Sequence, residues 1–364
     1  MEFRCERDAL VDDLAATTRA VASRGGSLPV LLGVRAALTG GQLELTASDL
    51  DLTIQARLTV DGITDGVAVL PARLAADIVR ALDQGAVHLE ATAEEARISS
   101  GRSQFTVRLL PADDFPRLVA PSGEEVTLDA PELAEALRQV VRAASSDDAR
   151  PILTGVLMAA EGDGLRLVAT DSYRLAVRDL RGASVLRQGQ SVLVPSKALG
   201  ELGRVLVGAE TVTLRLAERD ATFEVGTIRL TTRLIEGEFP NYRQLIPSSH
   251  PNRLSVGREP LLDALRRVKL LARETTPVRI TLRADGIELT ATTAEIGQAH
   301  EDLDAKYEGA EMVIAFNADY LVDGVEAVDG DEVTLETIDA LKPAVVRTAE
   351  GSDFLYLLMP VRVS

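Results

Sequence analysis

Side chains that could carry out catalysis are few in this sequence, and their spacing suits no common reaction. The three histidines, His88, His250 and His300, lie far apart and lack the spacing of a metal site. Cys5 is the only cysteine, and no histidine lies near it in sequence to activate it as a nucleophile. Neither a P-loop nor a Gly-x-Ser-x-Gly elbow is present. We therefore expect a protein that is not an enzyme and that holds no metal and no cofactor.

Positive charge is the other candidate for chemistry, because it gathers on segments with helical periodicity. A face lined by such helices would attract phosphates without contacting bases, which gives salt-dependent, sequence-blind DNA binding. Alternatively, these side chains only solvate exposed helix faces, and the formal net charge of −17 gives that alternative weight. One later helix, predicted over 319–329, is acidic. The helix-borne candidates for DNA contact are Arg73, Arg80, Arg138, Arg142, Lys197, Arg204, Arg266 and Lys269.

Composition limits the remaining classes of protein. Hydrophobic residues make up 46% of the 364-residue chain, which is normal for a globular protein, and at 3% aromatics offer no platform for stacking bases. A single cysteine excludes an intrachain disulfide and fits a reducing compartment. The charged start, Met1–Asp8, does not resemble a signal peptide, and no run approaches the roughly 18 apolar residues of a membrane span. We expect a soluble, cytoplasmic protein.

The sequence repeats itself three times. The segments Leu43–Asp49, Leu165–Asp171 and Ile287–Thr293 share an alternating pattern that ends in Ala-Ser-Asp, Ala-Thr-Asp and Ala-Thr-Thr. Their spacing is constant, since 171 − 49 = 122 and 293 − 171 = 122. This period is longer than that of solenoid repeats, so each unit should be a complete domain. We predict domains over 1–121, 122–248 and 249–364.

Each repeat shows the same order of elements. An amphipathic helix comes first, as the spacing of Leu133, Leu137 and Val140 in the second repeat shows. Strands with alternating apolar side chains follow, as over 210–216, and then come a second helix and further strands. We therefore predict an α+β protein of three tandem domains, each with helices and antiparallel sheet.

Several longer motifs resemble the beta subunit of bacterial DNA polymerase III, the sliding clamp family. They are Ala169–Val177, Arg233–Tyr242 and Tyr356–Arg362, supported by Ser48–Asp51 and Phe316–Tyr320, and the resemblance spans essentially all of the chain. It implies the DNA clamp fold, in which two chains join head to tail as a homodimer and form a ring of six domains. Helices would line a hole around duplex DNA, which is held topologically and without sequence specificity. The chain would then be a non-catalytic processivity factor.

The resemblance also implies a pocket between the second and third domains, where polymerases, the clamp loader and repair proteins insert a short peptide. Periodicity alone treats Leu153, Leu175, Leu357 and Met359 as ordinary core residues. Three departures from the family pattern, at Ser172-Tyr173, Ile152 and Leu245, change the predicted rim. The implied pocket residues are Arg150, Ile152, Leu153, Thr170, Ser172, Tyr173, Arg174, Leu175, Pro240, Leu245, Asn317, Tyr320, Leu357, Met359, Val361 and Arg362.

The implied dimer seam joins the first domain to the third domain of the partner chain. Apolar side chains would pack at its centre and opposite charges at its rim. Alternatively, Phe105 is a core residue and the charges are simply solvated. The family also implies a DNA contact at Arg24, in a loop. The seam candidates are Phe105, Val107, Leu270 and Leu271, with Arg97 and Arg102 facing Glu301, Asp302 and Asp304.

A second class of function stays open at this point. A diverged, clamp-like scaffold could bind proteins without encircling DNA, and the altered pocket rim is compatible with it. Mass in solution distinguishes the two, since a ring should run near twice 38.9 kDa. Retention on nicked circular DNA that is lost on linearisation is specific to a topological clamp.

Overall fold

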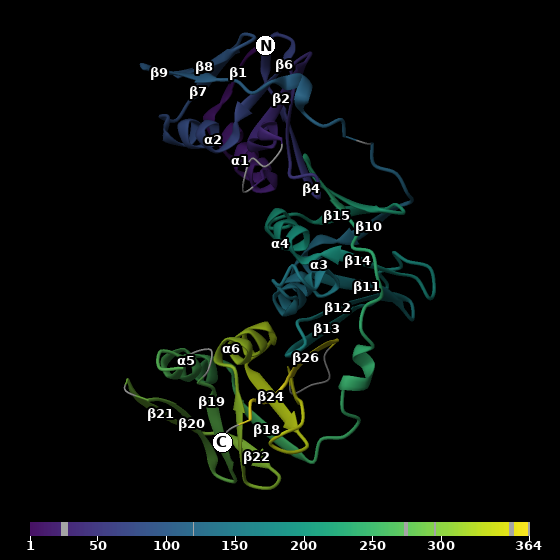
Figure 1. Cartoon of the computed structure of the whole chain (residues 1–364), viewed down its shortest axis with the longest axis vertical. Helices are drawn as coiled ribbons and strands as arrows, with labels where there is room; N and C mark the ends of the chain where they lie inside the picture. The colour runs from purple at the N-terminus through teal and green to yellow at the C-terminus, as the bar shows by residue number, and fades with distance from the viewer. Residues whose placement is uncertain (23–27, 119, 273–275, 295, 349–352, 363–364) are drawn as a thin grey trace. The chain divides into compact units, whose positions relative to one another are not determined.

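A computed structural model describes residues 1–22, 28–118, 120–272, 276–294, 296–348 and 353–362 of the chain (Figure 1). The chain divides into two compact units. Unit 1 consists of Met1–Pro131 and Glu201–Leu234, and unit 2 consists of Glu132–Gly200 and Ile235–Ser364. The middle repeat therefore contributes strands to both units.

The described residues of the first repeat form two α-helices and nine strands. Short 3-10 turns, η1 (Thr18–Ala20), η2 (Pro29–Leu32) and η3 (Ala112–Asp114), connect some of them. The elements in chain order are β1 (Glu2–Glu6), α1 (Arg7–Thr17), β2 (Gly33–Thr39), β3 (Gln42–Ser48), β4 (Leu52–Thr59), β5 (Asp61–Thr64), β6 (Gly66–Pro71), α2 (Ala72–Ala81), β7 (Ala86–Ala91), β8 (Glu95–Ser100) and β9 (Ser103–Arg108).

The second and third repeats follow the same order. The second consists of β10 (Glu125–Asp129), α3 (Ala130–Val140), η4 (Val141–Ala143), η5 (Pro151–Thr154), β11 (Gly155–Glu161), β12 (Gly164–Thr170), β13 (Arg174–Leu180), β14 (Ser191–Pro195), α4 (Ser196–Val205), β15 (Thr211–Leu216), β16 (Asp220–Val225) and β17 (Ile228–Arg233). After η6 (Tyr242–Leu245), the third consists of β18 (Asn252–Gly257), α5 (Arg258–Lys269), β19 (Val278–Arg283), β20 (Gly286–Thr293), β21 (Gly297–Leu303), β22 (Lys306–Glu308), β23 (Met312–Phe316), α6 (Ala318–Ala327), β24 (Glu332–Thr337), β25 (Ala344–Thr348) and β26 (Phe354–Leu358).

Unit 1 contains two antiparallel sheets. One has the order β5-β1-β7-β8-β9, and the other has the order β10-β15-β16-β17-β4-β3-β2-β6. The β17–β4 pair, in which Thr231 lies opposite Thr53, joins the second repeat to the first by a continuous ladder of hydrogen bonds. Helix α1 packs on α2, β3 and β4, and its side chains Leu10 and Leu14 are buried in this core.

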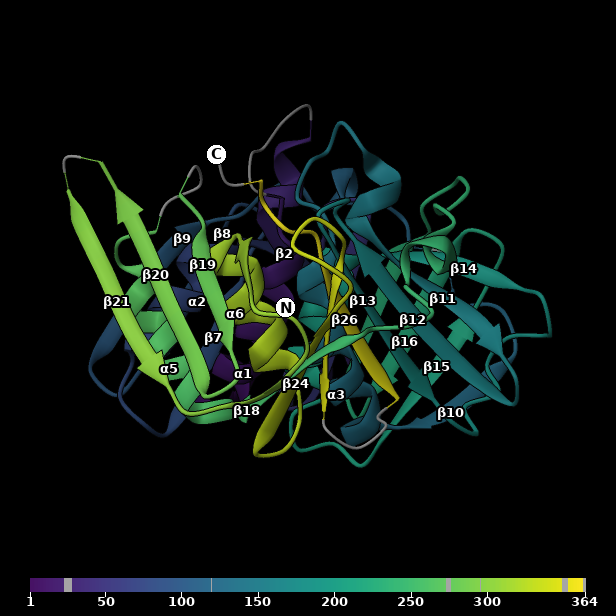
Figure 2. The same ribbon diagram turned by 90° about the horizontal axis from the view of Figure 1, so that it is seen from below.

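Unit 2 repeats this plan. Its larger sheet has the order β14-β11-β12-β13-β26-β25-β24-β18-β22, and its smaller sheet has the order β21-β20-β19-β23. The β13–β26 pair joins the third repeat to the second, as β17–β4 joins the second to the first. Figure 2 shows β19, β20 and β21 side by side with α5 on one face. Helix α5 buries Leu261, Leu265 and Val268 there.

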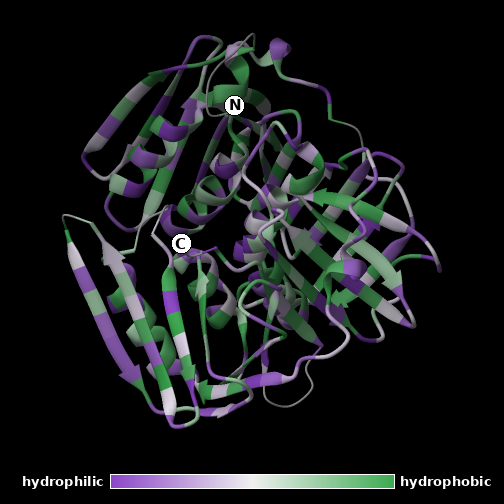
Figure 3. Cartoon of the chain, turned by 60° about the horizontal axis from the view of Figure 1, so that its bottom comes forward, coloured by the Kyte–Doolittle hydropathy of each residue, from purple (hydrophilic) through white to green (hydrophobic). Residues whose placement is uncertain are grey.

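The predicted alternation of strand residues and the repeat period are both present. Bands of hydrophobic and hydrophilic residues alternate along several strands, as half-buried antiparallel strands require (Figure 3). Strands β3, β12 and β20 begin at residues 42, 164 and 286, so 164 − 42 = 122 and 286 − 164 = 122. Their hairpins also agree, since Gly40 and Gly162 have φ of 53° and 58°. A Cβ atom is sterically unfavourable in that left-handed conformation, which explains glycine at both turns.

Candidate functional site

A tight turn after β12 brings Ser172 and Tyr173 to the surface of unit 2. One Asp171 carboxylate oxygen accepts from the backbone N–H groups of Tyr173 (2.8 Å) and Arg174 (3.0 Å). The Thr170 hydroxyl accepts from the Ser172 N–H at 3.1 Å and donates to the Arg174 carbonyl at 2.6 Å. Short polar side chains that bond their own backbone favour turns over continued strand. The turn therefore ends β12 and starts β13 with Tyr173 59% exposed.

Ser172 has a φ of 83°, so replacing it with glycine should stabilise the protein. The left-handed conformation costs a non-glycine residue about 1–2 kcal/mol, and the greater freedom of glycine in the unfolded chain offsets part of that gain. We expect Ser172→Gly to raise the free energy of unfolding by about 0.5–1 kcal/mol in urea titrations. Ser172→Ala, which keeps the strain and loses the hydroxyl, is the control. An equal gain in both variants would contradict the explanation.

Arg174 lies at the centre of this site. Its guanidinium pairs with Asp171 at 3.0 Å and Asp323 at 2.5 Å, lies 4.3 Å from the Tyr320 ring centroid and donates to the Tyr356 hydroxyl at 3.4 Å. Burial alone would lower the pKa of Arg174, but Tyr356, Asp323 and Asp171 outweigh burial and raise it. The cation therefore ties β13 to α6 and β26.

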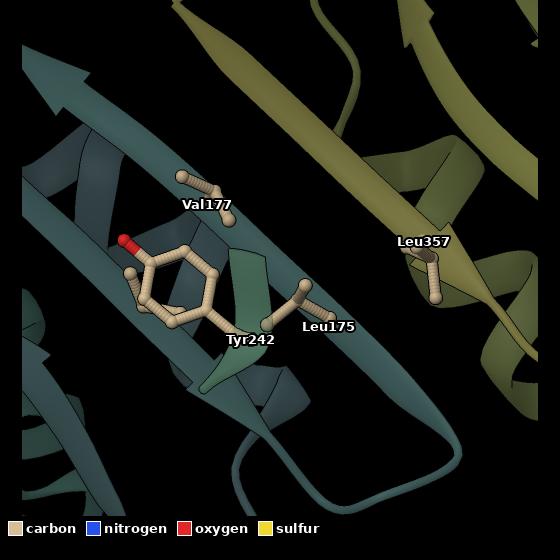
Figure 4. Packing of buried hydrophobic residues seen from close by; sticks show 5 residues of the cluster. Leu175, Val177, Tyr242 and Leu357 are labelled. Carbon is tan, nitrogen blue, oxygen red and sulfur yellow. The ribbon is translucent and has the colours of Figure 1, made fainter. Parts of the chain in front are cut away.

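A buried apolar cluster lies beside this arginine. Leu175 and Leu357 are Cα partners across β13 and β26, and both are 1% exposed. Val177 and Tyr242 belong to the same cluster, and Figure 4 shows the Tyr242 ring beside Leu175 and Val177 of β13. The segment that carries η6 thus packs on the face of the sheet to which β12, β13 and β26 contribute apolar side chains. Leu175 and Leu357 are core residues of the single chain, as periodicity alone predicted.

Exposed apolar side chains surround the same junction. Leu245 is 45% exposed, Met359 38% and Val361 37%. The Met359 N–H donates to the Tyr173 carbonyl at 2.9 Å, and the Tyr173 ring stacks on Tyr320 with centroids 6.4 Å apart. Apolar groups left in water beside a rigid charged centre are typical of a surface that binds another molecule.

The structure brings most of the other predicted pocket residues to the same elements. Arg150 donates to the Ser172 hydroxyl at 3.3 Å. Asn317 caps α6 by accepting from the N–H groups of Asp319 and Tyr320. Leu153 and Thr170 are buried, at 8% and 4% exposure, so they contribute no surface. Exposed Pro240 precedes η6, Ile152 lies on η5, and exposed Arg362 follows Val361.

Sequence reasoning missed the residues that hold this site in place. Tyr242, Val177 and Val168 complete the apolar cluster, and Asp323 and Tyr356 hold Arg174. Tyr242 and Tyr356 lay within the family motifs, which was the available signal. Nothing in sequence spacing indicated Asp323, because it is 149 residues from Arg174.

The predicted DNA-contacting side chains are exposed, but in unit 2 carboxylates of α6 and the turn after it pair with them. Glu326 accepts from Arg142 at 2.7 Å and from Arg266 at 3.0 Å. Lys269 pairs with Asp319, and Arg138 pairs with Asp329 at 3.1 Å. Burial would raise the pKa of Glu326, but Arg142 and Arg266 outweigh burial and lower it. Positive charge from α3, η4 and α5 is thus partly neutralised.

In unit 1 the predicted basic side chains pair mostly within their own helices. Arg80 pairs with Asp77 at 3.0 Å, and Arg204 pairs with Glu201 at 2.5 Å. Arg73 on α2 is exposed. Lys197 of α4, in unit 2, is exposed as well. Arg24 lies outside the described residues.

Comparisons with known proteins agree over the whole chain. Three family models of the DNA polymerase III beta subunit match in turn: the N-terminal domain over 1–119, the central domain over 127–241 and the C-terminal domain over 243–362. The curated beta sliding clamp of Streptomyces coelicolor is 34% identical over 376 residues, which cover 100% of both chains. That of Staphylococcus aureus is 32% identical and covers 100% of this chain and 99% of the other.

Solved structures agree as well. The sliding clamp of Bartonella birtlesii bound to griselimycin has a TM-score of 0.93 and 31% identity, with 100% of each chain covered. The sliding clamp of Bacillus subtilis has a TM-score of 0.90 and 30% identity, again with 100% of each chain covered.

The chain belongs to the DNA polymerase III beta subunit family, the bacterial sliding clamps. The predicted fold class, three tandem clamp domains of helices and antiparallel sheet, is therefore confirmed. This sliding clamp is a non-catalytic processivity subunit of DNA polymerase III and acts in DNA replication, so the prediction that it is not an enzyme is confirmed. None of the described helices of the clamp has the length and apolar character that crossing a membrane requires.

The predicted seam residues of the clamp lie at two sheet edges. Strand β9 is an edge strand of the five-stranded sheet in unit 1, and its Phe105 is 41% exposed. Val107 on the same strand is 6% exposed, so its side chain packs in the clamp's own core and presents no apolar surface, contrary to our expectation. Leu270 follows α5 in unit 2 and is 83% exposed, and Leu271 is half-buried.

Three of the five charges predicted at this seam, Arg97, Glu301 and Asp302, have partners within the chain. Arg97 pairs with Glu90 at 3.3 Å in unit 1. In unit 2, Arg267 pairs with Glu301 at 2.7 Å, and His300 pairs with Asp302 at 2.9 Å. Arg102 and Asp304 are exposed. Exposed pairs of this kind contribute at most about 1 kcal/mol, so their exchange across a seam would be nearly neutral.

Proposed function

We propose that this chain closes head to tail with a second copy into a ring that encircles duplex DNA without sequence specificity. The ring tethers DNA polymerases, the clamp loader and repair proteins, which insert short peptides at the surface around Arg174. The proposed domains span 1–121, 122–248 and 249–364, and the proposed compartment is the cytoplasm. Membership of the sliding clamp family over the whole chain, with three matched domains, carries this proposal.

Sheet edges support the ring. Strands β9 and β21 each end a sheet and leave backbone N–H and C=O groups without a ladder partner on one side. Exposed Phe105 lies on β9, and exposed Leu270 lies after α5, which packs on β21. An unlike pair of edges on one chain can join a second copy only head to tail, and such a contact closes into a ring of two chains when the rotation between the copies is two-fold.

Exposed apolar side chains support the tethering surface. Leu245, Met359 and Val361 lie around a rigid centre formed by Arg174 and Tyr320. Burying one or two apolar anchors of a peptide there gains roughly 1.5–3 kcal/mol each. The ordering of the peptide offsets part of this gain, which leaves a dissociation constant near ~1 µM. Binding of that strength lets partners exchange on a loaded ring.

The acidic helix α6 suits a ring that slides. Because Glu326 already holds Arg142 and Arg266, phosphates must compete with an internal partner for these cations. Loose contacts of this kind keep the affinity for DNA low. The closed ring around the duplex, rather than tight binding, then keeps the protein on DNA.

Replacing Glu326 with glutamine should strengthen DNA binding. The substitution removes the shorter ion pair of each arginine and leaves Arg142 with Asp323 at 3.4 Å and Arg266 with Asp263 at 3.5 Å. Both arginines are then more available to phosphates, and we expect the dissociation constant for a short duplex to fall about two- to fivefold. The salt dependence should steepen by about 0.9 for each additional phosphate that these arginines neutralise. Fluorescence anisotropy at several salt concentrations measures both. Glu308→Gln, an exposed carboxylate on β22, makes the same charge change and should have no effect. Equal effects of the two variants would mean that Arg142 and Arg266 do not face DNA.

A topological assay tests the proposed ring. The protein is loaded by the clamp loader of its own cell onto nicked circular DNA and separated from free protein by gel filtration. We expect it to stay on the circle and to be lost when a restriction enzyme linearises the DNA. Retention that does not depend on circularity, or no retention at all, would instead indicate a scaffold that does not encircle DNA.

A further inference from the structure

Unit 1 contains a cavity of about 260 Å³ for which the proposed ring has no use. It lies where strands β3, β4, β16 and β17 meet the connecting segment around residues 116–118 and 120–122. Its floor is the junction of the first and second repeats, because β17 pairs with β4 there.

The floor of this cavity is a row of hydroxyl groups that crosses four adjacent strands. Ser48 lies opposite Thr53, Thr53 opposite Thr231, and Thr231 opposite Thr222. The Ser48 and Thr53 hydroxyl oxygens are 2.8 Å apart, and those of Thr222 and Thr231 are 3.1 Å apart. All four residues line the cavity. Residues opposite each other in antiparallel strands share a face, so the register alone creates this row, which we call the hydroxyl row.

The same row in unit 2 is apolar at three of its four positions. Counting from Ser48 and Thr53, the equivalent positions are Thr170 and Leu175, since 170 − 48 = 122 and 175 − 53 = 122. Thr170 lies opposite Leu175, Leu175 opposite Leu357, and Leu357 opposite Val345. The backbone arrangement is thus the same at the two junctions, while the side chains change from leucine and valine to threonine.

The covering segment differs too. Tyr242 packs on the apolar junction of unit 2 (Figure 4). Its equivalent in unit 1 is Leu118, since 242 − 118 = 124, and this side chain is 39% exposed. The first junction is therefore left open where the second is filled.

Chemistry selects the ligand of this cavity. In a pair of hydroxyls one O–H donates to the other oxygen, so each pair keeps one O–H for a ligand that accepts hydrogen bonds. Arg117 is exposed on the connecting segment and lines the same cavity. The two carboxylates of the lining lie beside Arg233, because Asp51 pairs with it at 3.9 Å and Asp220 lies opposite it in the ladder. Arg117 is the other cation of the lining, and it is the one that a ligand meets. Hydroxyl donors and a guanidinium together suit a carboxylate, which only accepts.

We propose that this cavity is a second peptide-binding site, specific for an extended segment of a partner protein that presents an acidic side chain. This inference builds on the tethering function proposed above. It adds a second site that prefers an acidic side chain, whereas the surface around Arg174 prefers apolar side chains. An apolar anchor is rejected here, because it would cover one O–H of each hydroxyl pair without offering that O–H an acceptor. One ring would then hold two kinds of partner segment at two separate surfaces.

Peptide display on the full-length dimer tests the site. A random heptapeptide library is panned on the wild type, and the affinities of selected peptides are measured by fluorescence anisotropy. Thr53→Val with Thr231→Val removes two hydroxyls of the row without changing side-chain shape, and Arg117→Glu reverses the charge. Thr59→Val on the same strand, outside the cavity, is the matched control. Met359→Glu blocks the surface around Arg174 instead. Urea midpoints confirm that each variant folds.

We expect acidic peptides that bind the wild type, Thr59→Val and Met359→Glu equally, and that bind the two cavity variants at least about tenfold more weakly. If every selected peptide binds the cavity variants as well as the wild type, or only apolar peptides are selected, the second site is wrong. Apolar peptides that fail only on Met359→Glu would still support the tethering function. Acidic peptides without any apolar ones would support the cavity and contradict tethering around Arg174.

Discussion

Replacing Leu270 with aspartate is expected to convert the dimer into monomers of 38.9 kDa. The side chain is 83% exposed in the single chain, so the substitution should leave the fold intact. Burial of a leucine at an interface contributes about 1.5–3 kcal/mol, and an unpaired carboxylate in its place adds a desolvation cost of several kcal/mol. A ring of two chains has two identical seams, so the penalty applies twice. A loss of about 4 kcal/mol at each seam adds to about 8 kcal/mol, which weakens the dimer roughly a millionfold.

Light scattering after gel filtration measures the mass directly. Val207→Asp is the matched control, because Val207 is 81% exposed and follows α4, an element that carries none of the predicted seam residues. It should stay dimeric, and its retention on nicked circular DNA should equal that of the wild type. A dimeric Leu270→Asp variant, or a monomeric Val207→Asp variant, would place the seam elsewhere on the chain.

The repeated architecture could be predicted because its signals are local. Hairpin turns and alternating strands need only neighbouring residues, so the period of 122 located β3, β12 and β20 correctly. The helix carrying Leu133 and Leu137 followed from its own periodicity in the same way. The family then supplied the order of domains, which local patterns do not contain.

Burial at the candidate site could not be predicted from local pattern. Leu357 and Met359 are two residues apart and both apolar, yet one is 1% exposed and the other 38%. The difference arises because Leu357 pairs with Leu175 in the ladder and belongs to the buried cluster that contains Tyr242, whereas Met359 follows the end of β26. Burial of Val107 depends on long-range contacts in the same way. We predicted it at the seam, and its side chain is 6% exposed within its own unit.

Which charged side chains pair with each other also could not be predicted from the sequence. The acidic character of α6 was visible, but its role depends on α6 packing against α5, which brings Glu326 to Arg266. The hydroxyl row has the same origin. Thr53 and Thr231 are 178 positions apart (231 − 53 = 178), and only the register of β4 with β17 makes them neighbours.

A selective probe exists for the stability of unit 2. The chain has no tryptophan, and its five tyrosines, all numbered between 173 and 356, lie in unit 2. Tyrosine fluorescence during urea unfolding therefore follows this unit alone. It makes the consequences of substitutions around Arg174 measurable without interference from unit 1.

Replacing Arg174 with methionine is expected to lower the free energy of unfolding of unit 2 by about 3–5 kcal/mol, because Asp171 loses its paired cation and Asp323 keeps only the longer pair with Arg142, at 3.4 Å. Asp171 is 9% exposed and Asp323 27%, so water solvates neither side chain fully. Arg174→Lys, which keeps the charge and loses the planar fork, should lie between the wild type and the methionine variant.

Neutralising the two carboxylates tests whether electrostatics is the cause. Adding Asp171→Asn and Asp323→Asn to Arg174→Met should restore a large part of the lost stability, since no uncompensated charge remains. Peptide binding should stay weak in this triple variant, because Tyr320 has lost the cation that lies 4.3 Å from its ring. If the triple variant were no more stable than Arg174→Met, the arginine would act through packing of its aliphatic stem rather than through its charge.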